Sequence, residues 1–304
     1  MTTDRAGAPV LVGIDGSPSS LRAARWAARE AVRRGTGLRL VHAFGPMPVI
    51  APDRLDVGLP SDGDHRGHLL ARARDDLDAA AVAAVAEAPG LRVDSEVLPD
   101  FPITCLVAES RHAELVVIGD RGRGGVAGVF LGSVAVALAA RAACPVVVVR
   151  GDREPDATDP VVVGVDGSSV SDAAVAFAFE AAAARGAGLV AVHTWENVLS
   201  DELVVGIELK TVLDAERRHL VEVLAPHRAR FPGVAVRMQV RMGRPDRALC
   251  AAAERAQLVV VGSRGRGAFA GLFGSVSHAL LHRCPCPVVV VRPSLSVALH
   301  QVSG

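Results

Sequence analysis

A glycine-rich segment with two arginines is the part of this sequence best suited to bind an anion. It spans residues 119–133, reads GDRGRGGVAGVFLGS, and has the spacing G-x2-G-x9-G-S. Glycines permit positive φ and let an anion approach the backbone amides, and a helix opening at Ser133 presents unpaired N–H groups at the positive end of its dipole. Arg121 and Arg123 add fixed positive charge. The segment therefore predicts a site for a phosphate group, such as the phosphate tail of a nucleotide.

Two better-known glycine motifs do not fit this segment. A P-loop requires Gly-Lys-Ser/Thr, and the chain has one lysine, Lys210, far from any glycine loop. A dinucleotide fingerprint drawn from Gly122-x-Gly124-x-x-Ala127 would follow the fourth strand instead of the first, and no acidic residue lies about 20 positions further on. The remaining alternative is a glycine loop that binds no ligand. The sequence contains a second, similar loop after residue 262, and this repetition argues against that alternative.

The chain is an internal duplication, which we call the first and second copy. Three pairs of segments match: VLVGIDGS (10–17) with VVVGVDGS (161–168), AELVVIGDRGRGG (113–125) with AQLVVVGSRGRGA (256–268), and CPVVVVR (144–150) with CPVVVVR (286–292). Between the copies, residues 151–160 are charged and contain two prolines, which is typical of a linker. We therefore expect two nucleotide-binding domains, residues 1–152 and residues 159–304.

Each copy alternates short apolar runs with helical patterns. In the first copy we expect strands at 10–14, 38–44, 91–98, 115–118 and 146–150, and helices at 19–34, 67–86, 103–111 and 133–142, with a polar loop over 52–67. Five strands with crossover helices predict an α/β fold, in two tandem copies of a five-stranded parallel doubly wound (Rossmann-like) sheet domain. Ligands bind beyond the carboxyl ends of such strands, so the residues after the first and fourth strands are the candidates.

Composition narrows the class of protein and its compartment. The chain has 33 basic and 33 acidic residues, so it lacks the even positive field that attracts nucleic acid or an anionic membrane. The uncharged stretch 124–140 is interpreted as loop plus buried helix, not a membrane span, and the apolar stretch 9–14 is too short for a signal peptide. Five cysteines form no C-x-x-C pair, which indicates a reducing cytoplasm, and Cys284 and Cys286 are expected to be buried spectators.

Together these motifs resemble the tandem-domain form of the universal stress protein family. The likeness covers nearly the whole chain, and its most specific element is the G-x2-G-x9-G-S loop, which in this family marks the members that bind ATP. The resemblance implies ATP, with or without Mg²⁺, at both copies. From the residues themselves we expect no catalytic residue and no separate metal site. The contacts implied in the first copy are Gly13, Asp15, Val41, Gly119, Asp120, Arg121, Gly122, Arg123, Gly124, Gly125, Gly132, Ser133 and Val134. Those implied in the second copy are Gly164, Asp166, Val192, Gly262, Ser263, Arg264, Gly265, Arg266, Gly267, Ala268, Gly274, Ser275, Val276 and Ser277.

Several of these residues also have a simpler interpretation. An aspartate at the end of the first strand, Asp15, suits a ribose hydroxyl or Mg²⁺, but also a plain Asp-Gly-Ser turn. Ser133 suits a phosphate or the capping of the helix that follows it. Val41 would press on an adenine or belong to the core. His42 and its counterpart His193 have no second ligand at metal-binding spacing and are expected to be structural.

Two function classes remain. The first is a nucleotide-dependent regulatory module in the stress or dormancy response, and the alternative is a slow ATP-hydrolysing or phosphate-transferring enzyme at the same site. Asp120 is the one candidate for positioning a nucleophile, and the second copy has Ser263 in its place, so binding is favoured. The resemblance also implies that the fifth strands pair with each other and that the chain forms a homodimer. The loop after Gly265 is one residue shorter than the loop after Gly122, which predicts unequal sites.

Overall fold

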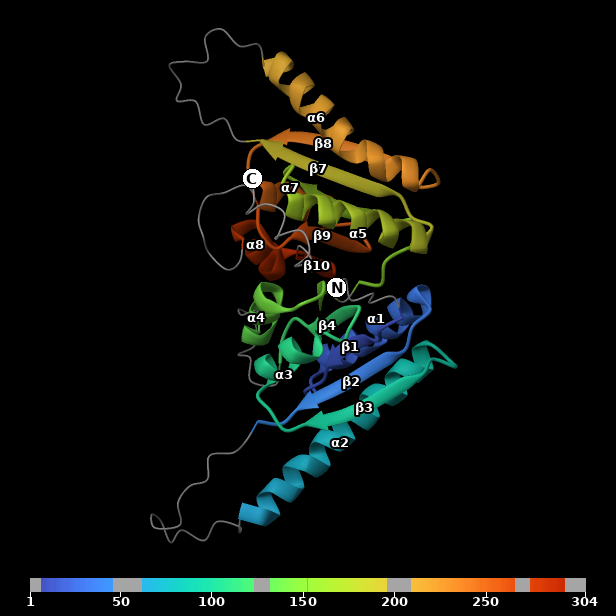
Figure 1. The fold of residues 1–304 in the computed structure, drawn as a ribbon, viewed down its shortest axis with the longest axis vertical. Coiled ribbons are helices and arrows are strands. Elements are labelled where there is room, and N and C mark those ends of the chain that lie inside the picture. The colour runs from blue at the N-terminus through green and yellow to red at the C-terminus, as the bar shows by residue number, and fades with distance from the viewer. Residues whose placement is uncertain are drawn as a thin grey trace, which may run out of the picture. The chain divides into compact units, whose positions relative to one another are not determined.

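The structure is a computed structural model that describes residues 7–45, 62–122, 132–151, 153–195, 209–265 and 274–292. The chain divides into two compact units, residues 3–143 and residues 144–304, the latter with the first two residues of the chain. We call these the first and second unit, and each is described by itself (Figure 1). The division falls before the last strand of the first sequence copy, not in the linker 151–160.

The first unit contains a parallel four-stranded sheet. Its strands are β1 (Val10–Gly13), β2 (Leu38–Ala43), β3 (Val93–Leu98) and β4 (Leu115–Gly119), in the order β3-β2-β1-β4. The valines of β1 are fully buried, as expected for a strand covered on both faces. The chain runs outward from β1 to β3 and then returns to the other side of β1, so the strand order reverses between β1 and β4, where open α/β sheets bind ligands.

Four helices cover this sheet in two pairs. They are α1 (Pro18–Arg34), α2 (Asp62–Glu87), α3 (Pro102–Glu109) and α4 (Ser133–Arg141), and α1 packs on α2 while α3 packs on α4. The helix α1 starts as its sequence predicts, because the Ser17 hydroxyl accepts from the Ser20 amide and a proline occupies the first turn. The polar stretch expected as a loop up to residue 67 is helical from Asp62.

The second unit repeats this arrangement and adds one strand. Its strands are β5 (Val146–Val149), β6 (Val161–Val165), β7 (Leu189–Trp195), β8 (Val236–Met242), β9 (Leu258–Gly262) and β10 (Val288–Val291), in the order β5-β10-β9-β6-β7-β8. Its helices are α5 (Ser169–Arg185), α6 (Leu209–Arg230), α7 (Pro245–Ala253) and α8 (Ser275–Arg283). The strand order reverses between β6 and β9, which correspond to β1 and β4.

The strand β5 comes from the end of the first sequence copy but pairs within the second unit. Val147 lies opposite Val289 in an antiparallel ladder, whereas the other strand pairs described in the two units are parallel. Arg150, just after β5, donates to the backbone carbonyl oxygens of Leu280 and Leu281 near the end of α8. The expected pairing of the two all-valine strands is therefore present, and it covers an edge that would otherwise invite aggregation.

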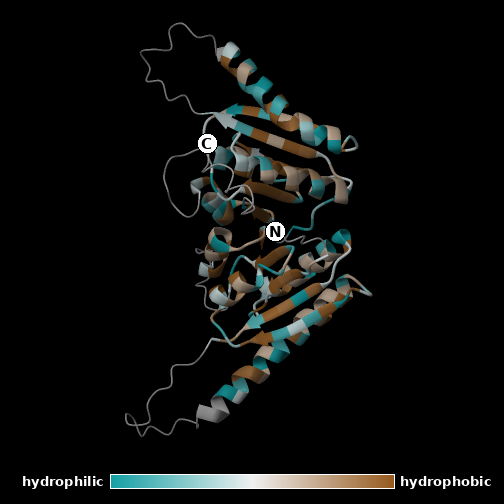
Figure 2. Cartoon of the chain, viewed as in Figure 1, coloured by the Kyte–Doolittle hydropathy of each residue, from teal (hydrophilic) through white to brown (hydrophobic). Residues whose placement is uncertain are grey.

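The predicted fold class is confirmed: the structure is α/β with mostly parallel strands and alternating strands and helices. Figure 2 shows hydrophobic residues concentrated on the strands, while the outer helices α2 and α6 carry many hydrophilic ones. The core consists mainly of Val, Ala and Leu, as the 3% aromatic content requires. Among the helices described, none combines the length and the apolar character that crossing a membrane demands.

Candidate functional site

A cavity of about 430 Å³ lies at the carboxyl ends of β1 and β4, where the strand order reverses. Its walls come from the ends of both strands, from β2, from α3 and from the first turn of α4. The lining residues are Gly13, Ile14, Asp15, Ser20, Val41, Ala43, Pro102, Leu106, Ile118, Gly119, Arg121, Gly122, Gly132, Ser133, Val134 and Ala135. They include every described residue that the sequence predicted for the first copy except Asp120.

One wall of the cavity is apolar and was largely missed from the sequence. Leu106 of α3 packs against the end of β1, where a Cβ at Gly13 would lie 2.9 Å from the leucine Cδ1 and 3.2 Å from Cγ2 of Ile118. Glycine at this position therefore makes room for the side chains of α3 and β4. A signal was present in the sequence, because the Pro102 to Leu106 spacing recurs in the second copy as Pro245 to Leu249.

Asp15 both closes a turn and lines the cavity. Its Oδ1 accepts from the backbone N–H of Ser17 at 3.0 Å, which is the Asp-Gly-Ser turn that the simpler interpretation predicts. Gly16 inside this turn has φ of +74°. Because one carboxylate oxygen holds the turn, the aspartate is fixed in place at the mouth of β1 and forms part of the cavity wall.

Gly119 and Gly122 are required for space, not for the positive φ that the sequence suggested. None of Gly119, Gly122 and Gly132 has a φ in the left-handed region. A Cβ at Gly119 would stand 2.7 Å from the carbonyl carbon of Ser19, and one at Gly122 would stand 2.8 Å from Oδ2 of Asp15. Side chains would therefore push the loop away from α1 and from the end of β1.

The first turn of α4 is open toward the cavity. Its N-cap is Gly132, which has no side chain to cap it, so Ser133 is the first helical residue and does not cap the helix as one interpretation predicted. The Gly132 N–H donates to the carbonyl oxygen of Asp120 at 3.1 Å and closes the base of the loop. The exposed Ser133 and the half-buried Val134 thus present the helix N-terminus, with its positive dipole end, to the cavity.

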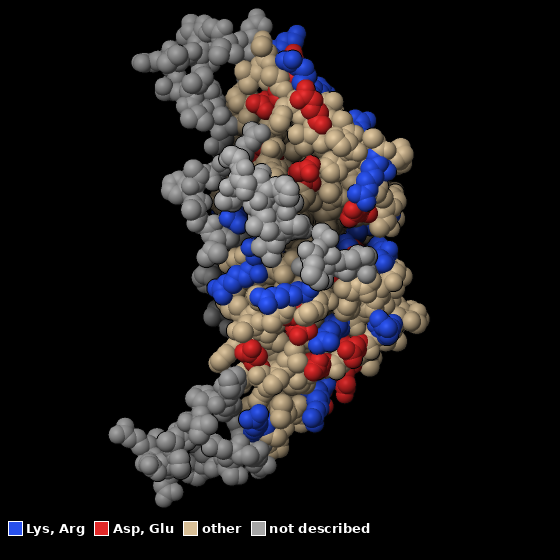
Figure 3. All heavy atoms as spheres, viewed as in Figure 1, with Lys and Arg blue, Asp and Glu red and all other residues tan. Residues whose placement is uncertain are grey.

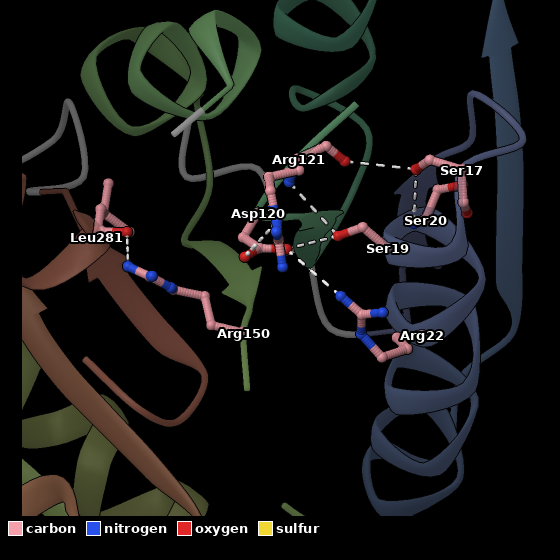
Figure 4. Close-up of polar contacts among 8 residues, drawn as sticks. All are labelled: Ser17, Ser19, Ser20, Arg22, Asp120, Arg121, Arg150 and Leu281. Atoms are coloured by element: carbon pink, nitrogen blue, oxygen red, sulfur yellow. Dashed lines mark hydrogen bonds and ion pairs between the residues drawn. The ribbon is translucent and has the colours of Figure 1, made fainter. Parts of the chain in front are cut away.

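Asp120 is not among the residues that line the cavity, and its side chain ties the end of β4 to α1 (Figure 4). Its carboxylate is buried, accepts from the Ser19 hydroxyl at 2.7 Å, and forms an ion pair with Arg22 at 3.6 Å. The neighbouring Arg121 also lies 3.4 Å from this carboxylate, and its backbone amide contacts the Ser19 hydroxyl. Asp120 is thus a tether between two elements of the first unit.

The second copy lacks this tether. The positions of Ser19, Arg22 and Asp120 are occupied there by Val170, Ala173 and Ser263, so all three partners are replaced together. The Ser263 hydroxyl is buried and has no hydrogen-bond partner among the residues described.

The rest of the second copy repeats the geometry of the first. Asp166 Oδ1 accepts from the backbone N–H of Ser168 at 2.9 Å, and a Cβ at Gly265 would lie 2.6 Å from Asp166 Oδ2. Gly274 is the N-cap of α8, and its N–H donates to the carbonyl oxygen of Ser263 at 2.9 Å. The bases of both glycine loops are therefore closed by equivalent hydrogen bonds.

The remaining predicted residues of the second copy lie around this loop base. Gly164 pairs with the buried Val192 across β6 and β7, and Ser277 donates to the carbonyl oxygen of Gly262 at 2.6 Å. Ser275 and Val276 form the first turn of α8, and Arg264 is exposed beside the loop. Six predicted residues lie outside the described residues: Arg123, Gly124, Gly125, Arg266, Gly267 and Ala268.

The histidines of β2 and β7 are held by the protein itself. His193 Nδ1 lies 2.7 Å from the carbonyl oxygen of Val165, and its Nε2 lies 3.0 Å from Glu216 of α6. His42 lies 3.7 Å from Asp76, and burial lowers its pKa. In the described part of the chain, no cluster of three or more His, Cys, Asp or Glu side chains is arranged to hold a metal ion.

The sequence model of the universal stress protein family matches the chain twice, over residues 8–150 and 157–292. The chain belongs to this family. Two universal stress proteins of Mycobacterium tuberculosis strain H37Rv are 40% identical over 309 residues and 39% identical over 306 residues, each alignment covering 97% of this chain and 100% of the relative. The crystal structure of a universal stress protein from Archaeoglobus fulgidus has the same fold, with a TM-score of 0.69 at 20% identity, over 96% of this chain and 98% of that chain.

Family membership supports a role in the stress response, as the resemblance implied. The surface charge is mixed: on the face drawn in Figure 3, basic and acidic side chains occur together on both units. This agrees with the equal numbers of basic and acidic residues in the whole chain.

Proposed function

We propose that the chain is an ATP-binding regulatory module of the stress response. The observation that carries this proposal is the convergence of the opening Asp15 motif and the G-x2-G-x9-G-S loop on one cavity. Its volume of about 430 Å³ lies within the range of small-molecule sites, about 300–1,000 Å³. Its place beyond the carboxyl ends of parallel strands, at the reversal of strand order, is where nucleotides bind in such sheets.

The walls of the cavity have a chemical character that suits the base, the ribose and the phosphates of a nucleotide. The apolar side, with Val41, Leu106 and Ile118, suits an adenine ring. The polar side, with Arg121 and the uncapped N-terminus of α4, suits phosphate groups. Asp15 stands at the cavity wall, where a carboxylate accepts from a ribose hydroxyl or binds Mg²⁺.

The arrangement favours binding over phosphoryl transfer. Transfer requires a group that orients the nucleophile, and Asp120 was the candidate from the sequence. Its carboxylate instead accepts from Ser19 and pairs with Arg22, outside the set of cavity-lining residues. Slow ATP hydrolysis is the alternative, and it would have to proceed without this residue.

The direct test is the melting temperature of the full chain with and without ATP and Mg²⁺. Ligand at about a hundredfold excess over its Kd adds roughly 2.7 kcal/mol, which corresponds to a rise of several degrees. Titration of ATP with Mg²⁺ removed by a chelator separates the contribution of the metal. An unchanged melting curve in millimolar ATP and Mg²⁺ contradicts the proposal.

Release of ADP over hours, measured on the same sample, distinguishes binding from hydrolysis. No turnover, or turnover that persists in Asp120→Ala, is expected from the tether role of this residue. Turnover abolished by Asp120→Ala at unchanged ATP affinity would favour the enzyme. The homodimer and the cytoplasmic location stay predictions, and light scattering checks the first against the chain mass of 31.5 kDa.

A further inference from the structure

Two cysteines of the second unit lie in contact although they are far apart in the sequence. Sγ of Cys250, on α7, is 3.6 Å from Sγ of Cys284, the residue that follows the last turn of α8. Both are free thiols; Cys284 is buried and Cys250 is half-buried. The pair therefore has one member open to a small reagent and one held behind it.

The surroundings of the pair distinguish its two members. Cys250 shares a hydrogen bond with Cys284, which together with the positive charges of Arg283 and Arg150 holds the pKa of the Cys250 thiol below its usual value. The same hydrogen bond and burial raise the pKa of the Cys284 thiol. Cys250 is thus the thiol that ionises first and attacks an oxidant, and Cys284 is placed to react with the product.

The other cysteines with resolved shifts are poor competitors. Burial raises the pKa of Cys105 to about 11 and that of Cys286 to about 12. The first copy has Val107 and Ala142 at the positions of Cys250 and Cys284, so the thiol pair is confined to the second copy. The first copy therefore has the corresponding helices without the thiol pair, and it serves as an internal control for oxidation of the second copy.

We propose that Cys250 and Cys284 are an oxidation site that hydrogen peroxide converts into a disulfide. The Cys250 thiolate attacks one peroxide oxygen; the S–O bond forms, the O–O bond breaks, and the leaving hydroxide takes a proton to become water. The sulfur of Cys284 then attacks the sulfenic acid; the S–S bond forms, the S–O bond breaks, and the second hydroxide leaves as water with the thiol proton. Two thiols and one molecule of hydrogen peroxide thus give one disulfide and two waters.

The two sulfur atoms start close to each other. The two sulfur atoms must approach from 3.6 Å to about 2.05 Å. The ends of α7 and α8 are already joined by an ion pair at 3.3 Å between Asp246 and Arg283. Arg150 holds the last turn of α8 through the carbonyl oxygens of Leu280 and Leu281. Figure 4 shows the second of these contacts.

The disulfide would fasten a helix that lies against the candidate site of the second copy. Leu249, the neighbour of Cys250 on α7, packs against Gly164 at the end of β6, as Leu106 packs against Gly13 in the first copy. Oxidation is therefore expected to restrain α7 at this wall, and the first copy has no equivalent restraint.

The test uses the full reduced chain, treated near neutral pH with a few equivalents of hydrogen peroxide and then alkylated in acid. Peptide mapping without reduction should find one cross-linked pair containing Cys250 and Cys284, with the loss of two free thiols per chain, reversed by dithiothreitol. Unchanged thiols, a disulfide between Cys284 and Cys286, or sulfinic acid at Cys250 without a cross-link would overturn the proposal. This measurement needs no variant.

Two variants separate the roles of the thiols. Cys284→Ser should leave Cys250 as a sulfenic acid that dimedone traps, whereas Cys250→Ser should abolish both the trapping and the cross-link. The matched control is Cys105→Ser, on the corresponding helix of the first unit, which should form the same cross-link at the wild-type rate. A cross-link that persists in Cys250→Ser, or is lost in Cys105→Ser, would contradict the assignment.

Discussion

Gly122 of the glycine loop lies directly against Asp15 at the end of β1, so closely that a Cβ on the glycine would stand 2.8 Å from Oδ2 of the aspartate. The equivalent approach, between Gly265 and Asp166, recurs in the second copy. In both copies the loop that could hold phosphates and the carboxylate that ends the first strand are positioned by the same contact.

This contact makes Gly122→Ala a sharp test of the nucleotide site. The methyl group must displace either Asp15 or the loop, and losing one hydrogen bond to a charged group, about 1.5–3 kcal/mol, weakens ATP binding about tenfold or more. Isothermal titration calorimetry measures the change. The matched control is Gly67→Ala on α2, where a Cβ meets no atom within 4 Å and affinity should be unchanged.

The two copies should bind nucleotide with different affinities. Equivalent hydrogen bonds close both loop bases, Gly132 to Asp120 and Gly274 to Ser263, so the residue missing from the second loop must be absorbed within it. Calorimetry should therefore resolve two classes of site that differ about tenfold or more. The tighter class should disappear in Gly122→Ala and the weaker class in Gly265→Ala. Two identical sites per chain would refute the asymmetry.

The Ser19–Asp120 hydrogen bond should show as coupling in a double-mutant cycle. Because the acceptor is a buried carboxylate, Ser19→Ala and Asp120→Ala should be non-additive in the free energy of unfolding by about 1.5–3 kcal/mol. Denaturant titration provides the measurement. A control cycle pairs Ser19→Ala with Asp94→Ala, an aspartate whose side chain is 71% exposed and whose partner is Arg39, and it should be additive. Additivity in both cycles would remove the tether role.

The carboxylate of Asp246 should make the stability of the second unit depend on pH. Hydrogen bonds from Arg244, at 3.0 and 3.1 Å, lower the pKa of this carboxyl below its ordinary value, with further help from Arg283. A depressed folded-state pKa contributes stability that is present above the unfolded-state value, about 3.9, and is lost as pH falls through the folded-state value.

The wild type should therefore have a higher free energy of unfolding than Asp246→Asn. This difference should be largest at about pH 5 and should shrink toward about pH 2. Denaturant titrations across this range give the comparison. The variant Arg244→Gln lacks the main hydrogen-bond donor to Asp246. Its free energy of unfolding, compared with that of Asp246→Asn, should therefore change less with pH than the wild-type value does. A difference between wild type and Asp246→Asn that stays constant with pH would contradict the assignment.

Much of the fold follows from local sequence patterns. The Val-rich runs of β1, β4 and β5 predict buried strands, and Ser17 with Pro18 predicts the start of α1, because these signals act within a few residues. The beginning of α2 was misplaced, since the polar residues before Gly67 carry no helical stripe of apolar residues. The repeat then predicts that what one copy forms, the other forms as well.

The site was predictable as a set of residues but not as an arrangement. The motif named the glycines, and the structure shows that space beside Ser19 and Asp15, not positive φ, is what requires Gly119 and Gly122. Pro102 and Leu106 were missed because an apolar pair on a short helix looks like ordinary core until the cavity it faces is known.

The sequence by itself determined the duplication, the family, the order of strands and helices, and the residues of the glycine loop, because each is written in local patterns or in their repetition. Only the tertiary structure decided that Asp120 binds Ser19 and lies outside the lining of the cavity, and that Cys250 meets Cys284. These two pairs are 101 and 34 residues apart in the chain. Such contacts depend on how packed helices and strands bring distant side chains together, and no local pattern of residue types specifies which partner each one finds.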